Sequence, residues 1–244
     1  MPKRTTRLKL HIAASRIHRW LALFVGAQLI LWFASGLVMS LLPIDRVRGE
    51  HLIVSEKPRL PPNLDYAPIN AFLGDDGASI GQLRFRSVLG RAVVDVELAD
   101  GRRYLHDART AERLPPIKAE EAQRIAVAAY RGRPTAPSVE PVTATSVEYK
   151  GPLPAWRIKV LDSENTRIYV STFGEIAGVR TGTWRFYDFF WGLHIMDWSG
   201  HENFNTPWLA AFAFGGLLIA FAGAVLLFMR WPRRRRENQR LSMQ

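Results

Sequence analysis

Two histidines and two acids lie close together near the end of the chain, in the stretch GLHIMDWSGHENFNTPW at residues 192–208. Within it, His194, Asp197 and His201 follow the spacing H-x-x-D-x-x-x-H. Imidazole nitrogens and carboxylate oxygens together can hold a divalent metal or ferric iron. These three residues are therefore a candidate metal site. The alternative is an interfacial segment in which Asp197 caps or pairs locally.

Histidine is scarce in this chain, so its placement is informative. The 244 residues include six histidines and no cysteine. Without thiolates the chain has no ligands for an ordinary iron–sulfur cluster and no attachment point for a c-type haem. His11 and His18 are seven residues apart and so share one face of a predicted helix, and His194 and His201 repeat that spacing. The repetition suggests ligands at both ends of a membrane.

Two uncharged segments must position these histidines. Trp20–Leu42 and Pro207–Met229 each run for 23 residues without Asp, Glu, Lys, Arg or His. At about 1.5 Å per residue, each helix would reach roughly 34 Å, enough to cross a hydrocarbon core of about 30 Å. We therefore predict transmembrane helices at 20–42 and 207–229, the first of them too long for a cleaved signal peptide. The aromatic residues within 184–206 predict an interfacial segment before the second helix.

The net charge of +11 is confined to the two ends of the chain. Twelve basic residues and one acid lie before Trp20 or after Met229, whereas residues 20–229 carry 21 basic and 21 acidic residues. A nucleic-acid-binding surface would lie on the folded part of the chain, so we expect no nucleic-acid partner. By the positive-inside rule the tails 1–19 and 230–244 are cytoplasmic. The chain is thus predicted to be a multi-pass protein of a bacterial inner membrane, with its middle in the periplasm.

The middle of the chain predicts an α+β domain. Residues 43–65 are rich in proline and charge, which is typical of a linker. Residues 66–116 and 117–183 each begin with a helical pattern and continue with alternating apolar and polar runs, such as KAEEAQRIAVAAY followed by TRIYVSTFG in the second half. We expect one helix and about four antiparallel strands in each half, so that the pattern occurs twice.

Three stretches resemble a known family. IKAEEAQRIAVAAYRG, followed by WRIKVLDSENTRIYVSTFGEIAGV, resembles a PepSY domain. IHRWLALFVGAQLILWFASGLVMSLLP and the closing LHIMDW…FNTPWL…GLLIAFAGAVLLFMRWPR are similar to the first and last spans of PepSY-associated transmembrane proteins. Larger members have four spans, so this chain resembles a short two-span form. The resemblance implies one of two roles, because some members are haem-containing reductases of ferric siderophores, whereas isolated PepSY domains bind or inhibit peptidases.

For a haem role the candidate axial ligands are His18, His194 and His201. His18 is expected at the cytoplasmic entry and His194 near the periplasmic exit, roughly 30 Å apart, so one haem cannot use both. A homodimer would let each histidine meet its copy. The small residues at Gly216 and at every fourth position after it suit such close helix association, and they suit equally well the packing of two helices within one chain.

Two functions therefore remain open. The first is a b-type haem component that passes electrons to the periplasm, toward a ferric siderophore or another iron complex, with electrons supplied by a membrane redox partner. The second is a non-enzymatic, membrane-anchored binding module that regulates a peptidase or another envelope partner. The lipid bilayer is a partner in both. The sequence contains no phosphate loop, serine-hydrolase elbow, zinc-protease motif or dinucleotide fingerprint.

Overall fold

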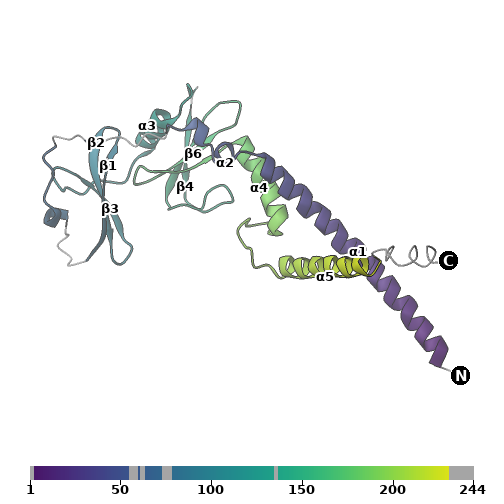
Figure 1. The fold of residues 1–244 in the computed structure, drawn as a ribbon. Helices are drawn as coiled ribbons and strands as arrows, with labels where there is room; N and C mark the ends of the chain where they lie inside the picture. The colour runs from purple at the N-terminus through teal and green to yellow at the C-terminus, as the bar shows by residue number, and fades with distance from the viewer. Residues whose placement is uncertain (1–2, 55–59, 61–63, 73–78, 135–136, 231–244) are drawn as a thin grey trace, which may run out of the picture. The chain divides into compact units, whose positions relative to one another are not determined.

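A computed structural model describes residues 3–54, 60, 64–72, 79–134 and 137–230 (Figure 1). Nearly all of the predicted tail 230–244 lies outside these residues. The chain divides into two compact units. We call Met1–Ser40 with Phe189–Gln244 the helical unit, and Leu41–Asp188 the sheet unit.

The helical unit contains the long helix α1, the end of α4 and the helix α5. Helix α1 (Lys3–Leu41) is 39 residues long, so the helix extends back through most of the predicted tail 1–19. Its segment Ala22–Leu41 is long and apolar enough to cross a membrane. In α5 (Pro207–Arg230) the apolar part with described side chains covers Pro207–Phe221, which is shorter than a span. The second crossing at 207–229 therefore stays a prediction.

Glycines bring α5 close to α1. A Cβ atom placed on Gly216 would lie 3.1 Å from Cδ2 of Leu29, and one on Gly215 would lie 3.4 Å from a methyl group of Val25. The first residue of the small-residue stripe therefore packs against another helix of the same chain. This is one of the two uses that the sequence left open.

The sheet unit is built from two antiparallel sheets, with strand orders β1-β2-β3 and β4-β5-β6-β7. Each strand lies inside a run that the sequence predicted as a strand. The strands are β1 (Ile80–Val88), β2 (Arg91–Leu98), β3 (Arg103–Asp107), β4 (Ser138–Val142), β5 (Ala155–Lys159), β6 (Arg167–Ser171) and β7 (Ile176–Arg180).

The two halves of the sheet unit differ in their helices. The second half opens with α3 (Ala119–Ala129), as predicted, and continues with four strands. The first half opens with the single 3-10 turn η2 (Ile69–Phe72) and has three strands, so it departs from the expected pattern of one helix and four strands. The predicted linker contains two further short helices, α2 (Ile44–Val47) and η1 (Glu50–Leu52).

One hydrophobic core joins the two sheets. Val93 of β2 and Ile168 of β6 belong to the same buried cluster, together with Ala122 and Ala126 of α3. These alanines lie on the apolar face that the sequence predicted for this helix. Because they are small, the helix can approach β4, β5 and β6 closely, and burial of the apolar surface shared by both sheets stabilises the unit.

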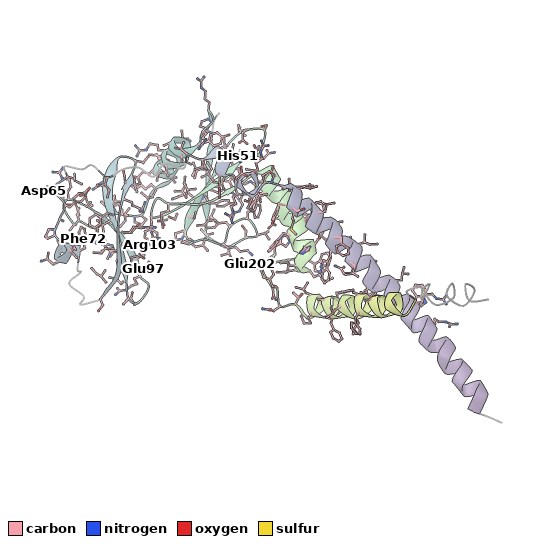
Figure 2. The ribbon with its side chains drawn as sticks, viewed as in Figure 1. His51, Asp65, Phe72, Glu97, Arg103 and Glu202 are labelled. Atoms are coloured by element: carbon pink, nitrogen blue, oxygen red, sulfur yellow. The ribbon has the colours of Figure 1, made fainter. Side chains whose placement is uncertain are left out.

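A charged contact also ties the first sheet to the turn between β6 and β7. Asp95 is 4% exposed and pairs with Arg103 at 3.1 Å and with Arg86 at 2.5 Å. Arg103 also pairs with Glu175 of that turn at 2.9 Å. Figure 2 labels Arg103 and its partner in the strand register, Glu97. Every carboxylate in this contact faces an arginine, as buried charges require.

Candidate functional site

His194 lies in the last turn of α4 (Gly182–Ile195), and α1 holds it at two points. Its ring nitrogen Nδ1 lies 3.0 Å from the Ser35 hydroxyl oxygen. Its backbone carbonyl accepts a hydrogen bond from Nε1 of Trp32 at 2.7 Å. Trp32 and Ser35 are three residues apart, so they share a face of α1. Helix α1 therefore fixes both the backbone and the side chain of His194.

Local sequence explains why the two helices meet here. Gly36 has no side chain, and a Cβ atom on it would already lie 3.6 Å from Cε1 of His194. A larger side chain would meet the imidazole ring directly. Helix α4 ends immediately after the histidine, because Met196 adopts a left-handed backbone conformation with φ at 56°.

An apolar groove lies beside this histidine. It has a volume of about 760 Å³, within the usual range for small-molecule and cofactor sites. His194 is the one side chain in its lining that can carry a charge or bind a metal. The residues lining the groove are Trp32, Phe33, Gly36, Leu37, Ser40, Trp191, His194, Ile195, Phe204 and Leu209.

The hydrogen bonds of His194 leave one of its ring nitrogens available. Among the residues that the structure describes, Nδ1 has Ser35 as its partner and Nε2 has none. An imidazole nitrogen with a free lone pair is the usual protein ligand of haem iron. The chemistry of the groove thus fits a flat, largely apolar group that accepts one nitrogen ligand.

Asp197 has a different role from its neighbour. Its carboxylate accepts hydrogen bonds from the backbone N–H groups of Glu202 and Asn203 at 2.9 Å, of Gly200 at 3.1 Å and of Ser199 at 3.4 Å. These hydrogen bonds, those from Asn203 and Glu202 most strongly, lower the pKa of the Asp197 carboxyl group below its usual value. Asp197 therefore organises the loop after α4, which is the local role considered as the alternative to metal binding.

His201 lies in that loop and is not among the described residues that line the groove. Its ring packs on α4 at Gly192, where an added Cβ atom would fall only 2.6 Å from the His201 Nε2 atom. Its carbonyl accepts a hydrogen bond from Nε1 of Trp191 at 3.0 Å. A side chain at position 192 would therefore force the His201 ring to move away from α4.

The predicted ligands do not all meet within one chain. His18 belongs to α1, 17 residues before Ser35, which is about 25 Å along the helix axis at about 1.5 Å per residue. In the described part of the chain, no three histidine or acidic side chains are arranged to hold a metal ion. A metal at His194, Asp197 and His201 would have to displace the backbone partners of Asp197. That site stays a prediction, without support from this geometry.

Comparison with known proteins identifies the family. A family model described as the PepSY-associated TM region matches residues 15–244. The chain belongs to this family. Membership makes it a membrane-associated protein, as the sequence predicted. No curated protein and no solved structure matches the chain, so the roles of individual residues rest on its own geometry.

Large aromatic side chains surround the site in this PepSY-associated chain. Phe189, Trp198, Phe204 and Trp208 are each more than half exposed, with Trp208 the most exposed at 68%. Such side chains are typical of the level at which a membrane meets water. Phe189, Trp198 and Phe204 fit the predicted interfacial segment 184–206, and Trp208 lies at the start of the predicted span 207–229.

Sequence reasoning missed Ser35 and Trp32 as site residues. Ser35 is a polar residue inside an apolar helix and is 2% exposed. Polar groups within membrane helices generally face a partner, so this serine was a usable signal. Trp32 carried no such signal, because its large apolar ring suits contact with lipid as well as contact with another helix.

Proposed function

We propose that this PepSY-associated membrane protein is a b-type haem component that passes electrons toward the periplasm, with His194 as an axial ligand. The observation that carries the proposal is the apolar groove of about 760 Å³ with one imidazole in its lining. The free Nε2 atom of that imidazole provides the ligand chemistry. Family membership supports the membrane setting.

Each part of the groove would have a defined task. His194 would hold the iron, and Trp32 with Ser35 would hold His194. The apolar and aromatic walls would exclude water, and burial of this kind is one means by which proteins set a haem potential. When bound, haem supplies one-electron oxidation and reduction.

The second axial position would be completed outside the single chain. His194 is the one histidine in the described groove lining, so a second ligand would come from a second copy of the chain in a homodimer. Electrons would arrive from a membrane redox partner on the cytoplasmic side. A ferric siderophore or a similar iron complex would be the periplasmic acceptor.

Haem titration into the detergent-purified full chain tests the proposal. We expect wild type to bind haem with a shifted Soret band and His194→Ala to lose that band. His201→Ala is the matched control, since this histidine lies in the adjacent loop and outside the groove lining. Thermal unfolding of each variant before titration reports whether it is folded.

Two outcomes would contradict the proposal. If folded His194→Ala bound haem with the wild-type spectrum, His194 would not be the ligand. If wild type bound no haem and instead retained an envelope peptidase in a pull-down, the anchored binding module would be the better description.

A further inference from the structure

We infer that Ser35 is a positioning residue that holds His194 in the tautomer with its proton on Nδ1. In that tautomer Nε2 carries the lone pair and is the nitrogen that binds a ligand in the groove. The consequence for haem binding rests on the proposed function. The assignment of the tautomer does not rest on the proposed function, and the tautomer can be measured without haem.

The contacts of the Ser35 hydroxyl group carry the inference. Its oxygen lies 2.8 Å from the carbonyl oxygen of Leu31, 3.0 Å from that of Trp32 and 3.0 Å from Nδ1 of His194. A hydroxyl group has one proton to donate and two lone pairs that accept. Carbonyl oxygens only accept, so if the serine proton pointed to His194, the lone pairs of the Ser35 oxygen would face both carbonyl oxygens. The serine proton therefore goes to one of the carbonyl groups, as commonly happens for serines within helices.

The tautomer of His194 follows from that assignment. With its proton directed to a carbonyl of its own helix, Ser35 presents an oxygen lone pair to Nδ1 of His194. Two lone pairs facing each other would repel, so Nδ1 must be the protonated nitrogen. The hydrogen bond made by one ring nitrogen decides which nitrogen is free for a ligand.

The surroundings keep this arrangement in place. Ser35 is 2% exposed, so water does not compete for its hydroxyl group. The hydrogen bond from Trp32 to the His194 carbonyl restrains the histidine backbone at the same time. Partners of this kind orient a ligating histidine, and their loss typically lowers affinity at a metal site about 10–100-fold.

The same helix offers a matched control in Ser40. This serine also lines the groove, but its hydroxyl group donates to the carbonyl of Leu37 at 2.8 Å and is exposed. Ser40→Ala removes an equivalent group from the same helix without touching His194. Ser35→Thr keeps the hydroxyl group, because threonine also bonds to a helical carbonyl one turn back.

Nitrogen-15 NMR of the histidine-labelled full chain in detergent, without haem, tests the tautomer. The resonance that His194→Ala removes belongs to His194. We expect that resonance to report a proton on Nδ1 in wild type, in Ser35→Thr and in Ser40→Ala. Ser35→Ala should shift the population toward a proton on Nε2. A proton on Nε2 in wild type, or an unchanged tautomer in Ser35→Ala, would overturn the inference.

Haem titration of the same variants tests the consequence. Ser35→Ala should weaken haem binding about 10–100-fold, while Ser35→Thr, which keeps the hydroxyl group, binds as wild type does. If wild type bound no haem but showed the predicted tautomer, the proposed function would fail and the positioning role of Ser35 would stand. If wild type and Ser35→Ala bound haem equally well, the positioning role would fail and the haem site would stand.

Discussion

Asp197 and His194 are three residues apart, and the structure gives them separate tasks. The Asp197 carboxylate gathers four backbone N–H groups, so replacing it with alanine should loosen the loop after α4. We expect faster amide exchange at Ser199, Gly200 and Asn203 in Asp197→Ala, measured by hydrogen–deuterium exchange. Glu202→Gln is the control, since it changes a neighbouring carboxylate and leaves the Asp197 oxygen atoms in place. Unchanged exchange in Asp197→Ala would contradict the loop role.

The lowered pKa of Asp197 predicts the pH dependence of that loop. Because the folded-state pKa of Asp197 lies below the unfolded value of 3.8, the loop contribution is fully present above that value. It is lost progressively as the pH falls from there through the lowered folded-state pKa. Exchange protection of the loop should therefore weaken in acid for wild type. In Asp197→Asn the exchange protection of the loop should already be lower at neutral pH. It should not fall further in acid through protonation of residue 197, because asparagine does not titrate.

At the residue scale, the sequence located the site but could not assign its parts. The spacing of His194, Asp197 and His201 alone leaves the helix phase open, because Gly200 and Pro207 can interrupt a helix. The helix ends at Ile195, and both Met196 and His201 have positive φ, at 56° and 57°. Non-glycine residues seldom adopt this conformation, so no sequence pattern signals it. Ser35 and His194 are 159 residues apart in the chain, so their contact is visible only in the folded structure.

At the element scale, the contact between α1 and α5 at Gly216 makes a direct prediction. A valine there would push its side chain into Leu29, because even a Cβ atom would lie 3.1 Å from it. Overpacking of this kind typically costs about 1–3 kcal/mol. We expect Gly216→Val to lower the thermal unfolding temperature in detergent.

Gly223 on the same helix provides the control for that substitution. A Cβ atom on Gly223 meets nothing within 4 Å, so Gly223→Val should leave the unfolding temperature close to wild type. Equal effects of the two substitutions would show that the helices are not held together at Gly216.

Elements with a strong periodic pattern were predictable. Helix α3 and the strands of both sheets lie where their apolar patterns placed them, because each buries a regular face in the shared core. The opening of the first half was not predictable in the same way. Its helical pattern is short, and the part of it that the structure describes forms a turn at Ile69–Phe72; so few residues do not repay the cost of starting a longer helix.

At the scale of the whole molecule, the fold class and the family follow from the sequence, and the orientation in the membrane is the prediction still to be measured. The chain has no cysteine, so single engineered cysteines report position without background. Thr143 lies in an exposed segment of the sheet unit. The cysteine of Thr143→Cys should therefore react with a membrane-impermeant maleimide in intact spheroplasts. Thr5→Cys should react only after the membrane is opened. The reverse pattern would contradict the cytoplasmic placement of the tails.

The absorption spectrum of the full chain, purified from its host membranes and recorded before and after reduction with dithionite, tests the haem proposal most directly. We predict a Soret band that shifts on reduction, together with a sharpened band at longer wavelength, and loss of both in His194→Ala. A colourless wild-type protein that also takes up no added haem would contradict the assignment of His194 as a haem ligand.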